Sequence, residues 1–236
     1  MNILALDTSS DACSAALLSD GVCHAEFTVE ARAHTRLILP MVERVLAQGG
    51  IELNAVDALA FGRGPGAFTG VRIATGVVQG LALAADKPVV PVSTLAAIAQ
   101  QAYLQEQAGH VLVAVDARMG ELYWGRYELA DGIMQLQGEE SVVPPEAAPL
   151  PESDEQLQNH WLGAGSGWRE YADTLQPRFA GCVKRINADY LPAAEYIAHL
   201  ASAAWQRGEA VDAELAQPVY LRNKVAETTR ERAMKS

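Results

Sequence analysis

The sequence predicts an α/β protein of two duplicated lobes, each with a mixed sheet flanked by helices. Short apolar runs alternate with longer helical patterns, an order typical of sheets covered by helices. The opening pattern of the chain, an apolar run that ends in an aspartate, is repeated after residue 109. Of 236 residues, 50% are apolar and 20% are charged, a composition that provides a core and excludes wholesale disorder.

The first thirty residues predict three antiparallel strands. They cover residues 3–7, 13–18 and 22–29. Asp20-Gly21 supplies the tight-turn signal between the last two. A helix is expected over 35–48, with apolar residues at helical spacing. These residues are Leu37, Ile38, Met41, Val42, Val45 and Leu46. Pro40 cannot donate a backbone hydrogen bond, so this helix is expected to bend or to start late.

A glycine-rich loop, residues 62–70 (GRGPGAFTG), follows a strand predicted over 56–61. Glycines let backbone N–H groups approach an anion, and the helix predicted over 71–85 adds a favourable dipole. No Lys followed by Ser or Thr completes a Walker A loop, and the helix starts too late for a dinucleotide-binding turn. The spacing alone leaves two alternatives open, a phosphate cradle and a tight turn capped by Thr69.

The second half of the chain repeats the opening unit. The apolar run 111–115 ends in Asp116, and a strand is expected over 122–127, so Asp7 and Asp116 occupy equivalent positions 109 residues apart. Two such units, each with its own helices, build the fold of actin-like ATPases and sugar kinases. The predicted divisions are an N-terminal lobe (1–108), a C-terminal lobe (109–218) and a basic C-terminal helix or tail (219–236). Further elements are expected at 88–92 (strand), 94–107, 168–175 and 193–207 (helices).

Charge and cysteine content bear on partners and compartment. Acids outnumber bases 29 to 18, a net charge of −11, whereas nucleic-acid affinity comes mainly from Lys and Arg. A role on RNA therefore needs another protein to supply most of the contacts. Three cysteines without a C-x-x-C pair fit reduced thiols, and neither a secretory signal nor a run of eighteen apolar residues is present. We expect a cytoplasmic protein without a membrane span.

Polar residues at the end of the first strand are candidates for chemistry. In an actin-like ATPase an acid at the place of Asp7 helps to hold a metal–nucleotide complex, and hydroxyls such as those of Thr8 and Ser9 meet phosphate. The alternative is that Asp7 and Ser10 satisfy the backbone of their own turn. The candidate nucleotide- or phosphate-binding residues are Asp7, Thr8, Ser9, Gly64, Gly66 and Thr69. No general base is identifiable beside them.

Histidine spacing argues against metal catalysis. The five histidines are His24, His34, His110, His160 and His199, and no two are closer than ten residues. No H-x-x-x-H pair presents two imidazoles from one helix face. The segment 163–167 (GAGSG) also departs from the G-x-S-x-G frame of serine hydrolases. We expect no catalytic residue and no metal ligand.

The stretch 70–85 is apolar on nearly all sides. Seven of its sixteen residues are Gly or Ala, and only Arg72 and Gln79 are strongly polar. Such a helix must be covered on more than one side. Small residues four apart form a flat ridge for another helix, so we predict an inter-subunit bundle with the 35–48 helix; burial in its own domain is the alternative. The predicted interface residues are Leu37, Met41, Val45, Arg72, Gly76, Gly80 and Ala84.

Six segments together resemble the TsaB (YeaZ) family. They are 3–9 (ILALDTS), 34–40 (HTRLILP), 64–73 (GPGAFTGVRI), 91–95 (PVSTL), 116–121 (DARMGE) and 218–222 (PVYLR). The resemblance covers essentially the whole chain. It implies an actin-like (ASKHA) fold and a place in the bacterial machinery that makes threonylcarbamoyladenosine beside the anticodon. The tRNAs concerned read codons that begin with adenine.

The resemblance also implies partners. In this machinery TsaC makes a threonylcarbamoyl-adenylate, and TsaD, a metal-containing paralogue, moves the group onto N6 of adenosine. TsaB is the non-catalytic scaffold that binds TsaD, joined by the ATPase TsaE, and meets tRNA only through the complex. It pairs with itself or with TsaD through the helices near 35–48 and 70–85. Thr94 and Ile98 stand where TsaD carries a histidine pair, which implies lost metal ligands.

No tightly bound cofactor is expected. Binding of ATP or ADP at a partner interface is left open by the sequence, and so is a second class of function. That alternative is a nucleotide-binding or nucleotide-hydrolysing enzyme that uses Asp7 and the 62–70 loop.

Overall fold

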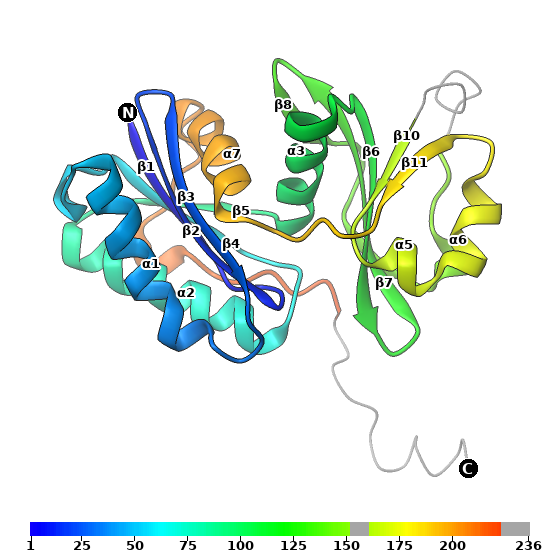
Figure 1. Ribbon diagram of the computed structural model, residues 1–236, viewed down its shortest axis with the longest axis horizontal. Helices are drawn as coiled ribbons and strands as arrows, with labels where there is room; N and C mark the ends of the chain where they lie inside the picture. Colours follow the sequence, from blue (N-terminus) through cyan, green and yellow to red (C-terminus); the bar gives the residue numbers. More distant parts are fainter. Residues whose placement is uncertain (152–160, 223–236) are drawn as a thin grey trace, which may run out of the picture.

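Two mixed β-sheets form the two lobes of the computed structural model, which describes residues 1–151 and 161–222 (Figure 1). The first sheet contains β1 (Asn2–Asp7), β2 (Ala12–Ser19), β3 (Val22–Val29), β4 (Ala58–Gly62) and β5 (Val89–Val92), in the order β3-β2-β1-β4-β5. The second contains β6 (His110–Arg118), β7 (Glu121–Ala130), β8 (Ile133–Leu136), β10 (Trp161–Ala164) and β11 (Val183–Asn187), in the order β11-β10-β6-β7-β8. A short strand, β9 (Ser141–Val143), also pairs with β7.

The two sheets share one topology. In the first, β1 pairs antiparallel with β2 and parallel with β4. In the second, β6 pairs antiparallel with β7 and parallel with β10. Replacing β1, β2, β3, β4 and β5 by β6, β7, β8, β10 and β11 reproduces the strand order. Asp7 is the last residue of β1 and Asp116 lies near the end of β6, so the predicted duplication is confirmed.

Helices cover both faces of the first sheet. On one face lie α1 (His34–Gly49) and α2 (Phe68–Ala85), which pack with alternate residues such as Leu4 and Leu6. On the other face lies α7 (Ala194–Gln206), which packs with Ile3 and Ala5. Successive strand residues point to opposite faces, so the apolar run of β1 is buried on both sides.

The last helix of each half packs on the sheet of the other lobe. Helix α3 (Thr94–Glu106) follows β5, yet its Leu95 and Ile98 pack with Val111 and Val113 of β6. Conversely, α7 follows β11 but covers the first sheet. The predicted boundary at 108/109 thus separates the strands, whereas the two helices cross it. The chain then returns to the first lobe, where Val211 pairs with Val89.

Three predicted details differ from the structure. Helix α2 begins at Phe68, with Ala67 as its N-cap, so Thr69 lies inside the helix and does not cap it. Helix α1 begins at His34 and continues through Pro40, so its predicted late start is not observed. The helix expected at 168–175 is two short helices, α5 (Gly167–Glu170) and α6 (Ala172–Phe179).

The remaining described elements are short. The 3₁₀ turns are η1 (Leu53–Ala55), η2 (Pro145–Ala147) and η3 (Ala213–Leu215). Residues 219–222 of the predicted C-terminal helix or tail have no regular structure, and 223–236 lie outside the described residues.

Helix α2 has the length and apolarity of a membrane-crossing helix, alone among the helices of residues 1–151 and 161–222. Its Val71, Ala74, Val78 and Ala82 are buried, and the last three belong to the core of the first lobe. This placement is that of a core helix in an α/β domain.

Candidate functional site

The glycine-rich loop packs directly on the turn that follows β1. The Ala67 N–H donates to the Ser9 carbonyl oxygen (2.7 Å), and the Thr8 hydroxyl donates to the Gly70 carbonyl oxygen (2.7 Å). A Cβ on Gly66 would lie 2.4 Å from the Ser9 carbonyl oxygen, and one on Gly70 would lie 1.9 Å from that of Thr8. Glycine is needed here because two segments of the chain approach closely. This geometry favours the tight turn over the phosphate cradle, although Thr69 does not cap the helix that follows.

Asp7 is fully buried next to the start of this loop, where a Cβ on Gly62 would lie 1.9 Å from its Oδ2. Its Oδ1 accepts hydrogen bonds from the Ser9 N–H (3.0 Å) and the Ser9 hydroxyl (2.9 Å), while Oδ2 has no hydrogen-bond partner among the described residues. Burial raises the pKa of Asp7 from 3.8 to about 7, although both bonds from Ser9 lower it. The carboxyl group thus serves its own turn, as the alternative held, and Ser10 likewise accepts from the Ala12 N–H (3.1 Å).

A cavity of about 550 Å³ lies between the lobes, next to this loop. Of the six candidate nucleotide-binding residues, Ser9 and Gly66 belong to its lining. The structure does not bring the other four to the cavity. These are Asp7, Thr8, Gly64 and Thr69.

Arginines in the cavity lining are already paired with carboxylates of the chain. The pairs are Arg118–Asp116, Arg169–Asp189 and Arg222–Glu121, with N···O distances of 2.9, 2.5 and 2.5 Å. The lining also contains acids, Asp11, Asp116 and Glu170. A nucleotide polyphosphate binds by charge-assisted contacts with cations, and here it would compete with these carboxylates.

Thr94 and Ile98, the positions where the resemblance implies lost metal ligands, also line the cavity. The Thr94 hydroxyl donates to the Pro65 carbonyl oxygen (2.5 Å). Ser93 caps α3 by accepting from the Leu95 and Ala96 N–H groups. The Thr94 hydroxyl, which bonds to Pro65, and the alkyl side chain of Ile98 are not among the usual zinc ligands.

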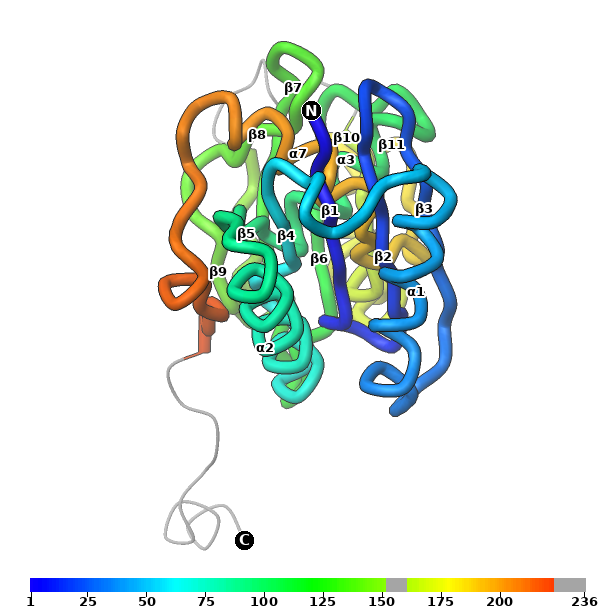
Figure 2. The backbone as a smooth tube through the Cα atoms, turned by 90° about the vertical axis from the view of Figure 1, so that its left-hand side faces the viewer, coloured from blue at the N-terminus to red at the C-terminus, as the bar shows by residue number. Residues whose placement is uncertain are grey.

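The second candidate site is the outer surface of α1 and α2, which lie side by side (Figure 2). Gly76, Gly80 and Ala84 are all exposed, as expected for a surface ridge. A Cβ on Gly76 or Gly80 would meet no atom within 4 Å. Leu83 beside them is 71% exposed. We call these four residues, Gly76, Gly80, Leu83 and Ala84, the glycine ridge.

The returning segment 213–222 lies on the opposite side of α2 from α1 (Figure 2). Gln79 donates from Nε2 to the Ala216 carbonyl oxygen (3.0 Å), and Arg72 donates from Nε to the Tyr220 hydroxyl (3.0 Å). The Arg72 guanidinium also stacks on Phe68, 3.6 Å from the ring centroid. Arg72, a predicted interface residue, is therefore held by its own chain. Between α1 and this segment, no residue in 1–151 or 161–222 covers the glycine ridge.

Two predicted interface residues of α1 lie in the core instead. Met41 is 4% exposed and Val45 is fully buried, and Leu37 packs half-buried against the same cluster. The apolar stripe of α1 covers the first sheet, because a helix of an α/β layer must bury one stripe against its own strands. Leu39, outside the predicted set, is 46% exposed on α1.

Known proteins resemble this chain over most of its length. A family model described as "TsaD: tRNA N6-adenosine threonylcarbamoyltransferase" matches residues 27–229. The chain is 45% identical over 227 residues to the tRNA threonylcarbamoyladenosine biosynthesis protein TsaB of Escherichia coli K12, covering 96% of each chain. It is 39% identical over 229 residues to the protein of that name from Haemophilus influenzae, covering 95% of each.

Solved structures agree with the fold. YeaZ from Pseudomonas aeruginosa is 50% identical and superposes with a TM-score of 0.87, covering 93% of this chain and 99% of that one. A second structure, described as an uncharacterized protein with similarity to peptidase YEAZ from the same organism, has a TM-score of 0.88 at 50% identity, covering 94% and 99%. Together with the two mixed sheets flanked by helices, these similarities confirm the predicted actin-like (ASKHA) fold.

Proposed function

This chain belongs to the TsaB (YeaZ) family, and on that premise we propose that it is a non-catalytic subunit in threonylcarbamoyladenosine formation on tRNA. Its relatives are named as biosynthesis proteins of this modified nucleoside. The chain binds and stabilises TsaD, with TsaE as a further partner, in the cytoplasm. TsaD transfers the threonylcarbamoyl group, and tRNA is contacted only through the complex.

The exposed glycine ridge supports this proposal most directly. Two glycines in an exposed helix each cost about 1 kcal/mol relative to alanine. Neither Gly76 nor Gly80 has a positive φ or a close internal neighbour that would require glycine. A helix from another subunit supplies the missing reason, because helices pack most closely where side chains are small.

The same ridge accounts for two kinds of pairing. TsaD is a paralogue of the same fold, so it presents its own pair of helices to α1 and α2 in a four-helix bundle. Without TsaD, two copies of this chain pair through the identical surface, as a two-fold interface allows. Leu83 and Leu39 supply exposed apolar area, at 71% and 46% exposure.

The surroundings of Asp7 support the absence of an activity of its own. Its carboxyl group is fully buried next to Gly62 and does not line the cavity, and the arginines lining the cavity are paired with acids. We therefore propose no tightly bound nucleotide. ATP or ADP at the interface with a partner is a separate question, which nucleotide titration of the assembled complex answers.

The test is Gly80→Arg, with Gly181→Arg as its matched control. Both glycines have open space where the Cβ would stand and no positive φ, so both variants fold with little change in melting temperature. We expect Gly80→Arg to weaken TsaD binding by about 30-fold or more, the effect of a binding hot spot of about 2 kcal/mol. The control retains binding by titration calorimetry, and only Gly80→Arg fails to restore the modified nucleoside in cells lacking the native gene. Normal TsaD binding by Gly80→Arg would contradict the proposal.

A further inference from the structure

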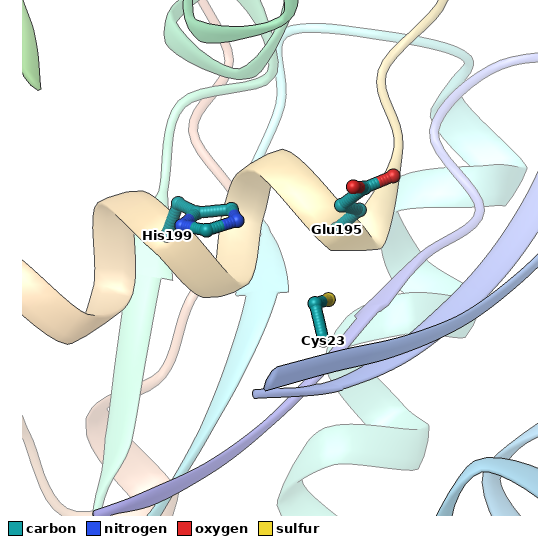
Figure 3. Close-up of side chains that lie close together, drawn as sticks. All are labelled: Cys23, Glu195 and His199. Atoms are coloured by element: carbon teal, nitrogen blue, oxygen red, sulfur yellow. The ribbon is translucent and has the colours of Figure 1, made fainter. Parts of the chain in front are cut away.

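Three metal-ligating side chains from distant parts of the sequence converge beside the first sheet (Figure 3). Cys23 lies on β3, and Glu195 and His199 lie on α7. One candidate ligand atom from each residue lies within 4.8 Å of the other two. This cluster is separate from the cavity between the lobes and from the glycine ridge.

The fold fixes where each side chain points. Glu195 and His199 are four residues apart on α7, so they occupy one face of the helix on successive turns. Cys23 pairs with Leu18 in the sheet and packs in the cluster beneath α7. The next residue, His24, points to the opposite face, where its ring would lie 3.6 Å from a Cβ on Gly49 of α1.

The three side chains have no alternative partners among the described residues. All are half-buried, and none makes a hydrogen bond or an ion pair with a residue in 1–151 or 161–222. Burial and the nearby Glu195 carboxylate raise the pKa of the Cys23 thiol to about 11. The charge of a bound cation would oppose both influences, since it would stabilise the thiolate and neutralise the carboxylate.

We propose that Cys23, Glu195 and His199 bind a zinc ion, with water in the fourth position. A thiolate, an imidazole and a carboxylate are ligands that zinc accepts, whereas magnesium and calcium prefer oxygen atoms alone. Zinc bonds of about 2.0 to 2.3 Å place tetrahedral ligand atoms about 3.5 Å apart, so side-chain rotations of the order of 1 Å close the site. On binding, the Cys23 thiol loses its proton to solvent and forms the Zn–S bond.

A metal at this place would fasten an edge strand of the first sheet to a helix from the far end of the chain. β3 has a neighbour on one side only within its sheet, and residues 23 and 195 are distant in sequence. A metal ion that binds the folded state and not the unfolded state stabilises the folded state by mass action. Because α7 and α2 cover opposite faces of the sheet, this site is independent of the proposed function.

Cobalt(II) is the probe for the first measurement, with tag-free protein stripped by a chelator. We expect one equivalent of Co²⁺ to bind, with a thiolate-to-cobalt charge-transfer band and the d–d spectrum of a tetrahedral site, and Zn²⁺ to displace it. Cys23→Ser abolishes the charge-transfer band, and His199→Gln weakens binding by at least about tenfold. His24→Gln, which alters the neighbouring residue on the opposite face, retains both.

Three results would overturn the proposal. One is a folded wild-type protein without the charge-transfer band. Another is a band that persists in Cys23→Ser, since it would belong to Cys13 or Cys182. The third is an equal loss in His24→Gln. As a measurement that needs no variant, the melting temperature of the wild-type protein must rise with added Zn²⁺, and an unchanged value contradicts the site.

Discussion

The two lobes have the same strand order, but their equivalent aspartates lie in different environments: one is buried and the other lines the cavity. Asp7 is fully buried, accepts hydrogen bonds from Ser9 and from no other residue of the part of the chain that the structure describes, and has a pKa raised to about 7. Asp116 lines the cavity, accepts from the Arg118 N–H (2.8 Å) and the Tyr171 hydroxyl (3.1 Å), and forms an ion pair with the Arg118 side chain. A residue's place in a duplicated unit therefore does not determine its environment.

The segments after β4 and β10 explain the difference. In the first lobe, the loop after β4 reaches over the β1 turn before α2 begins at Phe68. In the second lobe, α5 begins at Gly167, three residues after the end of β10, and Asp116 remains beside the cavity. The long α2 also presents the glycine ridge, whereas its counterparts α5 and α6 are short. The burial of the first aspartate and the presence of an exposed glycine ridge thus both depend on the longer segment that follows β4 in the first lobe.

The largest effect is expected from Gly70→Ala, which tests how tightly the first loop must pack. The added Cβ would stand 1.9 Å from the Thr8 carbonyl oxygen, so the loop and the β1 turn must separate. We expect the free energy of unfolding to fall by about 3 kcal/mol or more, measured by urea denaturation. A change below about 1 kcal/mol would mean that the loop does not cover Asp7 rigidly.

The second prediction concerns the pH dependence of stability due to Asp7. Its folded-state pKa is raised, so the folded state holds the proton more tightly and stability declines as pH rises from about 4 to about 7. Between pH 5 and pH 8 the loss is about 2 to 3 kcal/mol. Asp7→Asn removes this part of the slope, so urea denaturation of wild type and variant at both pH values measures it. Parallel slopes in the two proteins would show that Asp7 is not buried as a carboxylic acid.

The same variant distinguishes the two candidate functions. A non-catalytic scaffold with Asp7→Asn should still support full tRNA modification, whereas a nucleotide-hydrolysing enzyme that uses Asp7 would lose its activity.

A smaller effect is expected at the second aspartate from Tyr171→Phe. The variant loses the hydroxyl that donates to Asp116 (3.1 Å) and to the Glu121 carbonyl oxygen (3.3 Å). Because Asp116 keeps its bonds from Arg118 and the site is partly open to solvent, we expect a loss of about 1 kcal/mol in urea denaturation. A loss as large as that of Gly70→Ala would remove the contrast between the lobes.

The smallest effect, and the only gain, is expected from Gly76→Ala. It lies on the same helix as Gly70, but its Cβ meets nothing within 4 Å. The free energy of unfolding should rise by about 0.5 to 1 kcal/mol, because alanine is the better helix former. Differential scanning calorimetry at a protein concentration that keeps the chain monomeric measures this gain, and a loss in the monomer would indicate that the ridge is covered within the chain itself.

Local patterns predicted much of this structure. The strands of the first lobe, the repeated aspartates and the small-residue ridge follow from spacing, because Gly76 and Gly80 fall on one helix face whatever covers it. The sequence pattern of α1 predicts a partner interface as readily as a contact with the sheet, because an apolar stripe has the same spacing in both cases. Met41 and Val45 belong to the sheet side, which becomes visible only when β1 and β2 are in place.

Long-range placement could not be read from the sequence. Glycine is required at positions 66 and 70 because a Cβ there would clash with the backbone of Ser9 and Thr8, which lie about sixty residues earlier in the chain. Histidine spacing predicts no metal ligand, and the i, i+4 pair of Glu195 and His199 carries no such signal by itself. The structure brings Cys23, from the other end of the chain, close to this pair, which the sequence pattern does not predict. His160, another histidine of that argument, lies outside the described residues.

The reciprocal placement of α3 and α7 has a consequence for synthesis on the ribosome. When β5, the last strand of the first sheet, has been translated up to Val92, the helix that must shield the second face of the sheet has not yet been made, because it begins only at Ala194. During translation, the face of the first sheet that α7 covers therefore stays exposed as an apolar surface until Gln206 has left the ribosome. The two lobes are therefore expected to fold together, and neither is expected to be stable when expressed without the other.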